Sequence, residues 1–182
     1  MKITFLFILL AYYSIAIAED YSFINKCNVP YAVMLSIAHV ERELSHETGY
    51  PYMISFNSRK DYFNAKRKGL FRNVKEMHNE RNIDCLNKKK CIKLTDTLLA
   101  INIDNIDIGA YQLNVRYHKL PTEDYFSLER EYLYACGYIN TLVKNSGKWD
   151  WETVARYHSS LKTKNIVYQK LLKRAYARLI KE

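Results

Sequence analysis

A carboxylate on an apolar helix face is the feature that most restricts how this chain can fold. Residues 31–44, YAVMLSIAHVEREL, predict a helix in which Met34, Ile37, Ala38 and Glu41 share one face. The first three are apolar and predict contact with the core. Burial of Glu41 on the same face would raise the pKa of its carboxyl, because desolvation disfavours the charged form. The alternative is a boundary residue whose stem packs and whose carboxylate reaches water.

The N-terminal stretch, MKITFLFILLAYYSIAIAED, predicts a secretory signal peptide over residues 1–18. A basic residue, Lys2, precedes an apolar run at residues 3–10, and Ala16 and Ala18 form a small-x-small cleavage site. The run is short for a stable membrane span, although an uncleaved anchor stays an alternative. Residues 19–182 suit one domain and contain no later stretch that predicts a span.

Basic residues exceed acidic ones, with 28 Lys and Arg against 19 Asp and Glu and a net charge of +9. An exported basic protein suits an anionic surface or polymer as a partner. Export argues against nucleic acid, which leaves the cell-wall polymer and membrane surfaces.

Four cysteines, Cys27, Cys85, Cys91 and Cys136, follow the signal peptide. An even number in an exported protein predicts two disulfides, for which three pairings are possible. The short polar stretch between Cys85 and Cys91 favours a local link, which would leave Cys27 for Cys136; the other pairings stay open. No metal site is expected, because the chain has no CxxC pair and no histidine at ligand spacing near a cysteine.

The remaining periodicity predicts an extended segment at residues 52–56 and helices at 127–143, 151–160 and 165–180. The apolar face of the last helix is interpreted as core. Residues 59–105 predict short helices at 62–68, 74–80 and 95–101, with Lys88–Lys90 inside the loop that a Cys85–Cys91 link would close. We interpret residues 59–103 as an insertion on the domain, because they hold too few large apolar residues for a second core.

Three separated motifs resemble those of the lytic transglycosylases. SIAHVERE at 36–43 resembles the AIxxxES block, with Glu41 at the position of the catalytic acid. NIDIGAYQLN at 105–114 resembles the (D)xGLMQIN block, and WETVARYHSS at 151–160 resembles the W-x-x-A-x-x-YHS block, followed by Asn165 and Tyr168. The resemblance is to the small, single-domain, specialised enzymes that accompany conjugation, secretion and pilus machines. It covers most of the chain except residues 59–103, and Cys27 and Cys136 fall where many of these proteins carry a paired cysteine.

This resemblance implies a mainly α, α+β lysozyme-like fold, with a central catalytic helix and a small irregular or β insertion. It implies cleavage of the MurNAc–GlcNAc β-1,4 bond of peptidoglycan to give 1,6-anhydroMurNAc ends. Glu41 would act first as the acid and then as the base, which requires a raised pKa. No cofactor or metal ion is implied. The expected setting is the periplasm, with a monomer acting on glycan strands, alone or with a secretion, conjugation or pilus apparatus.

The second motif supplies candidate substrate-binding residues through the resemblance. Gly109 would let the backbone approach the saccharide closely. The amides of Gln112 and Asn114 would hydrogen-bond sugar hydroxyls and N-acetyl groups. Tyr111 would either stack on a sugar ring or lie in the core.

The third motif supplies Tyr157, whose hydroxyl would contact the catalytic acid, together with His158 and Ser159. His158 is equally explained as a structural histidine. The chain also departs from the family pattern: Arg42 replaces the usual Ser, and Ala110 and Tyr111 replace Leu and Met. These departures put the rate and the shape of the cleft wall in doubt.

The sequence is also compatible with two other functions. A hydrolytic, lysozyme-like muramidase would need a second carboxylate, for which Asp104 and Asp107 are the candidates in the second motif. A weakly active, basic wall-binding or assembly protein would keep the motifs only for the fold.

Overall fold

The computed structural model describes residues 21–41, 45–77 and 81–181. The predicted signal peptide at residues 1–18, the family departure at Arg42 and the predicted end of the first helix at residue 44 lie outside these ranges. Within them, no helix has both the length and the apolar character needed to cross a membrane.

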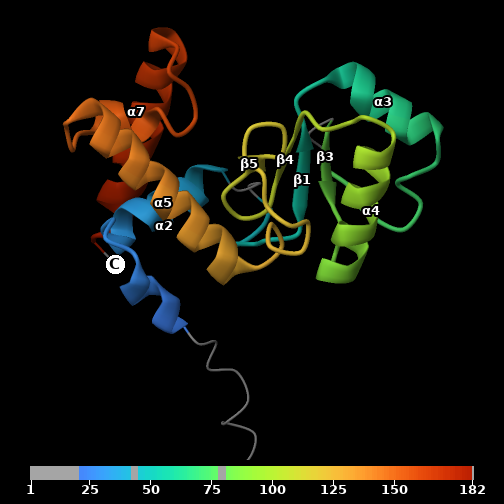
Figure 1. Ribbon diagram of the computed structural model, residues 1–182, viewed down its shortest axis with the longest axis horizontal. Coiled ribbons are helices and arrows are strands. Elements are labelled where there is room, and N and C mark those ends of the chain that lie inside the picture. Colours follow the sequence, from blue (N-terminus) through green and yellow to red (C-terminus); the bar gives the residue numbers. More distant parts are fainter. Residues whose placement is uncertain (1–20, 42–44, 78–80, 182) are drawn as a thin grey trace, which may run out of the picture.

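The protein belongs to the α+β class, with a helical part and a small antiparallel sheet (Figure 1). The helical part consists of η1 (Tyr21–Lys26), α2 (Tyr31–Glu41), α5 (Leu128–Ser146), α6 (Trp151–Ala155) and α7 (Lys162–Leu179). In this part α7 packs against both α2 and α6. The other part holds α3 (Arg59–Arg67), α4 (Lys88–Ala100) and the sheet. Its strands are β1 (Met53–Phe56), β2 (Lys75–Glu76), β3 (Asn82–Asp84), β4 (Ile106–Ile108) and β5 (Leu113–Asn114).

The sheet is built around β1, in the order β2-β3-β1-β4-β5 with antiparallel pairs throughout. Ile54 of β1 lies opposite Ile83 of β3 and Ile108 of β4, and all three side chains are fully buried. Cross-strand contacts between β-branched residues stabilise a sheet face and fix its register. The predicted extended segment at 52–56 is therefore the central strand.

Residues 59–103 contribute β2 and β3 to this sheet, and they also hold α3, which contacts β1, and α4. Their buried side chains, such as Ile83 and Leu98, belong to the same hydrophobic cluster as Met34 and Ile37 of α2. The helix predicted at 74–80 is wrong over its described part, because residues 75–76 pair with β3 instead.

The first turn of α4 also differs from the prediction. Lys88–Lys90 lie in this helix and not in a loop. The Asn87 side chain caps the helix by accepting a hydrogen bond from the Lys90 N–H at 3.1 Å. The helix therefore begins before residue 95, where apolar spacing alone placed it.

Both disulfide pairs favoured by the sequence are present. Cys27–Cys136 joins the segment before α2 to the middle of α5, with a Cα–Cα distance of 6.0 Å. Cys85–Cys91 joins the end of β3 to the first turn of α4. Each part of the molecule thus has one covalent link.

The buried carboxyl group of Glu131 attaches the β4–β5 turn to the helical part. Burial raises its pKa well above the usual range, and two backbone hydrogen bonds oppose the shift. Glu131 of α5 is fully buried, and its two oxygens accept hydrogen bonds from the Ala110 N–H at 2.7 Å and the Tyr111 N–H at 3.0 Å. Gly109 precedes them with a φ of 84°, and a Cβ there would collide with both oxygens. Glycine is therefore required by the Glu131 contact.

We predict that Glu131→Gln destabilises the fold by about 2–3 kcal/mol, because an amide can accept at only one of its two positions and its NH₂ group would face a backbone donor. Urea unfolding measures the change. Glu129→Gln on the same helix is the matched control, since Glu129 forms only an exposed ion pair with Lys26 and should change stability by less than about 0.5 kcal/mol. Equal effects of the two substitutions would contradict the prediction.

Candidate active site

A cleft of about 1340 Å³ runs between the helical part and the sheet. Its lining includes most of the residues singled out by sequence motifs: Glu41, Gly109, Gln112, Asn114, Tyr157, His158 and Ser159. The fold therefore brings three separated motifs to one cavity. Tyr111 is the exception, because its side chain does not line the cleft.

Glu41 is the central ionisable group of this cleft. It lies at the end of α2 as described, and its side chain is only 15% exposed. Burial raises the pKa of its carboxyl from 4.5 to about 7, opposed by a hydrogen bond from Tyr168 and reinforced by the nearby charge of Asp107. Such a carboxyl carries a proton in part of the population near neutral pH, so it can both give and take one.

Tyr168 of α7, rather than Tyr157, makes the described hydrogen bond to Glu41. Its hydroxyl donates to Glu41 Oε1 at 2.5 Å, whereas the Tyr157 hydroxyl donates to the Tyr111 carbonyl at 2.7 Å. The role expected of Tyr157 is therefore corrected. Tyr168 was interpreted as core because it lies on the apolar face of its helix, and spacing alone does not separate the two roles.

His158 lies against the same pair. Its ring stacks on Tyr168 with centroids 4.8 Å apart and planes 13° apart, and its Nδ1 lies 3.8 Å from Glu41 Oε1. Burial lowers the pKa of the imidazole, opposed by the charge of Asp107. A neutral imidazole thus borders Glu41 at neutral pH. Ser159 has a local role, because its Oγ accepts the Leu161 N–H at 3.2 Å.

A second carboxylate, Asp107 of β4, lines the same cleft. Its Oδ2 accepts from the Asn57 amide at 2.8 Å and its Oδ1 accepts from the Asn114 amide at 2.7 Å. Burial raises the pKa of Asp107, while the two amides oppose the shift. Asp104, the other candidate, does not line the cleft and pairs with Arg116 at 2.7 Å.

The β4–β5 turn forms part of the cleft wall in a strained backbone conformation. Gln112 has a φ of 47°, and its amide donates to the Gly109 carbonyl at 2.7 Å. Tyr111 lies in the core, only 3% exposed, with its ring 6.1 Å from that of Tyr132. Of the two predicted roles for Tyr111, sugar stacking is wrong and core packing is right.

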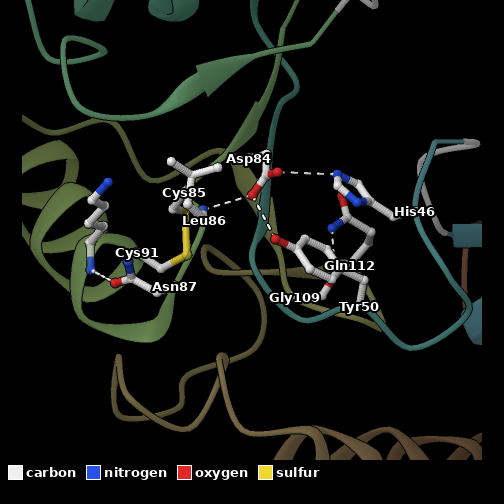
Figure 2. Close-up of a disulfide and its surroundings, with 10 residues drawn as sticks. His46, Tyr50, Asp84, Cys85, Leu86, Asn87, Cys91, Gly109 and Gln112 are labelled. Atoms are coloured by element: carbon white, nitrogen blue, oxygen red, sulfur yellow. Dashed lines mark hydrogen bonds and ion pairs between the residues drawn. A yellow bond between two sulfur atoms is a disulfide. The ribbon is translucent and has the colours of Figure 1, made fainter.

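The sheet end of the cleft is held by a cluster around Asp84, shown in Figure 2. The Tyr50 hydroxyl donates to Asp84 Oδ1 at 2.9 Å, and His46 Nε2 lies 3.4 Å from Oδ2. The His46 and Tyr50 rings stack at 4.1 Å. Asp84 is the last residue of β3 and directly precedes Cys85 of the disulfide. The end of β3 therefore carries both the disulfide and this part of the cleft wall.

The described residues contain no group of three or more His, Cys, Asp or Glu side chains arranged to hold a metal ion. Comparisons with models of known families, with curated proteins and with solved structures give no match for this chain. What the cleft can do is therefore argued from its own geometry: a carboxyl of raised pKa, a second carboxylate and several amides around one cavity.

We predict that Glu41→Gln stabilises the protein at high pH and not at low pH. Below pH 4.5 the carboxyl is protonated in both folded and unfolded chains, so its ionisation contributes no difference. Between 4.5 and 7 the folded chain binds more protons than the unfolded one, and wild-type stability falls as pH rises. Above 7 the full penalty, roughly 3 kcal/mol, is present in the wild type and absent in the variant.

Urea unfolding of both proteins near pH 4 and pH 8 measures this difference. A stability difference that is the same at both values would show that the carboxyl of Glu41 is not perturbed by burial. Glu152→Gln on α6, whose carboxylate is exposed, is the control and should give no pH-dependent difference.

Proposed function

We propose that this protein is a lytic transglycosylase with a lysozyme-like fold, which cleaves the MurNAc–GlcNAc β-1,4 bond of peptidoglycan for local wall remodelling. The observation that carries the proposal is the protonatable carboxyl of Glu41, with a pKa of about 7, in a cleft lined by amides. The motif resemblance assigns the same residue as the acid.

The reaction needs one residue in two protonation states. Glu41 gives its proton to the glycosidic oxygen as the bond from that oxygen to the anomeric carbon breaks. The resulting carboxylate then takes the proton of the C6 hydroxyl of the same MurNAc, whose oxygen bonds to the anomeric carbon and closes the 1,6-anhydro ring. Glu41 gives one proton to the glycosidic oxygen and recovers one from the C6 hydroxyl. It therefore returns to its starting protonation state without water or a cofactor.

The surrounding groups suit this task. Tyr168 fixes the position of Glu41 Oε1 by its hydrogen bond. The amides of Gln112, Asn57 and Asn114 line the cleft, where sugar hydroxyls and N-acetyl groups need donors and acceptors. A lysozyme-like arrangement is supported by the helix that carries the acid facing a small antiparallel sheet across the cleft.

The setting we propose is the periplasm, with glycan strands as the partner. Two disulfides are typical of an oxidising, exported environment, and the predicted signal peptide supports export. A net charge of +9 favours contact with an anionic wall. Action as a monomer, alone or beside a secretion, conjugation or pilus apparatus, follows only from the resemblance.

We predict that Glu41→Gln lowers the release of muropeptides from purified sacculi by at least about 1000-fold, because the general acid and base is lost. Mass spectrometry of the wild-type products should show 1,6-anhydroMurNAc ends. Glu152→Gln, an exposed carboxylate on α6, is the control and should keep full activity. Cleavage retained in Glu41→Gln would reject the mechanism, and tight sacculus binding by an inactive wild type would favour a wall-binding protein.

A muramidase is the second candidate, and Asp107 is the observation that favours it. Asp107 and Glu41 line one cleft, and the charge of Asp107 contributes to the raised pKa of Glu41. A hydrolase would use such a second carboxylate either to activate water or to form a covalent intermediate. Its products would carry reducing ends.

Replacement of Asp107 separates the two candidates. For the transglycosylase, Asp107→Asn should keep anhydro products, and the pKa of Glu41 should fall because a like charge is removed, which moves the alkaline limb of the pH–rate profile to lower pH. For the muramidase, the same change should lower kcat by about 100-fold or more. Asp104→Asn, outside the cleft, is the matched control.

A further inference from the structure

An exposed aromatic ring stands at the rim of the cleft. Tyr117 follows β5, lines the cleft and is 73% exposed, more than any other large apolar or aromatic side chain of the described residues. No aromatic ring in the described part of the chain packs against it. The catalytic scheme above makes no use of this ring.

The backbone that carries Tyr117 is firmly held. The N–H groups of Tyr117 and His118 both donate to the Asn114 carbonyl, at 3.1 and 2.9 Å. The buried Tyr125 hydroxyl donates to the His118 carbonyl and accepts the Leu120 N–H at 3.1 Å. An exposed ring on a fixed backbone loses little conformational entropy when a ligand covers it.

An aromatic wall begins at His118, the residue after Tyr117, and consists of His118, Tyr134, Tyr138 and Tyr157, all of which line the cleft. The His118 ring meets Tyr138 edge-on, with centroids 4.8 Å apart, and Tyr134 at 5.7 Å. Tyr138 in turn lies 5.7 Å from Tyr157. Burial lowers the pKa of His118, so the wall is uncharged at neutral pH.

This wall connects the rim to the centre of the cleft. Tyr157 directly precedes His158, whose Nδ1 lies 3.8 Å from Glu41 Oε1, and all three residues line the cleft. The ring contacts therefore run from Tyr157, next to His158, to His118, which is the chain neighbour of Tyr117. An uncharged aromatic surface of this kind matches a ligand with an apolar face and polar edges.

We propose that Tyr117 and the aromatic wall form a binding subsite for a pyranose ring of the glycan strand, outside the position where Glu41 cleaves. The C–H face of a pyranose ring would cover the exposed Tyr117 ring, and its hydroxyls would meet the tyrosine hydroxyls and amides of the cleft. This assignment rests on the proposed function for the identity of the ligand as a glycan. It adds a specificity-determining group to the site.

The test measures binding of chitopentaose, a β-1,4-linked N-acetylglucosamine oligomer, by calorimetry. The parent is the full chain carrying Glu41→Gln, which prevents turnover in every arm. Adding Tyr117→Ala should weaken binding about tenfold, whereas Tyr117→Phe should keep the affinity within about twofold because the ring remains. Phe63→Ala is the matched control, since Phe63 is an exposed aromatic on α3 that does not line the cleft, and it should change nothing.

In the active protein, Tyr117→Ala should raise KM for soluble glycan strands about tenfold and leave kcat within about twofold. Unchanged pentaose affinity in Tyr117→Ala, or no pentaose binding by the parent, would overturn the subsite. An equal loss in Tyr117→Phe would also overturn it, because the hydroxyl and not the ring would then bind. Failure of the proposed function has a different signature, in which wild type releases no muropeptides while pentaose binding still depends on Tyr117.

Discussion

The contact between the Glu131 carboxyl group and the β4–β5 turn is the interaction on which the cleft depends. Glu131 belongs to the helical part, while the Ala110 and Tyr111 N–H groups that it binds belong to the sheet. If one of these donors were removed, the buried carboxyl group would keep an acceptor without a partner, which is costly. The contact therefore fixes the separation of the two parts, and with it the distance across which Glu41 faces Asp107.

Burial also gives Glu41 the raised pKa on which the proposed reaction depends. The same desolvation that raises the pKa of Glu41 also costs stability once the carboxyl ionises. Tyr168 reduces that cost by donating to the carboxylate, and the neutral His158 ring stacks on Tyr168. Burial in such a site lowers the stability of the fold when the carboxyl is ionised, but it also lets the carboxyl exchange a proton near neutral pH.

Sequence reasoning predicted the features that have a local signal. The helix predicted from residue 151 begins there, where the Asp150 side chain accepts the Thr153 N–H, and the helix predicted at 127–143 ends close by at Ser146, before Gly147 in the left-handed conformation. Strands β2 and β3 were missed, because two or three residues carry no measurable periodicity. Glu131 and Tyr168 were missed for a different reason. Nothing in the helix periodicity distinguishes them from other helix residues, because their roles depend on partners far away in the sequence.

The acid is held by a partner from the far end of the chain. Tyr168 lies 127 residues after Glu41, on the C-terminal helix α7. During synthesis, a chain that lacks α7 already contains α2 and the whole sheet, but not the hydroxyl that holds the Glu41 carboxyl group. The candidate site is thus completed last, so a partly made or truncated chain lacks the hydrogen bond that positions the Glu41 carboxyl group.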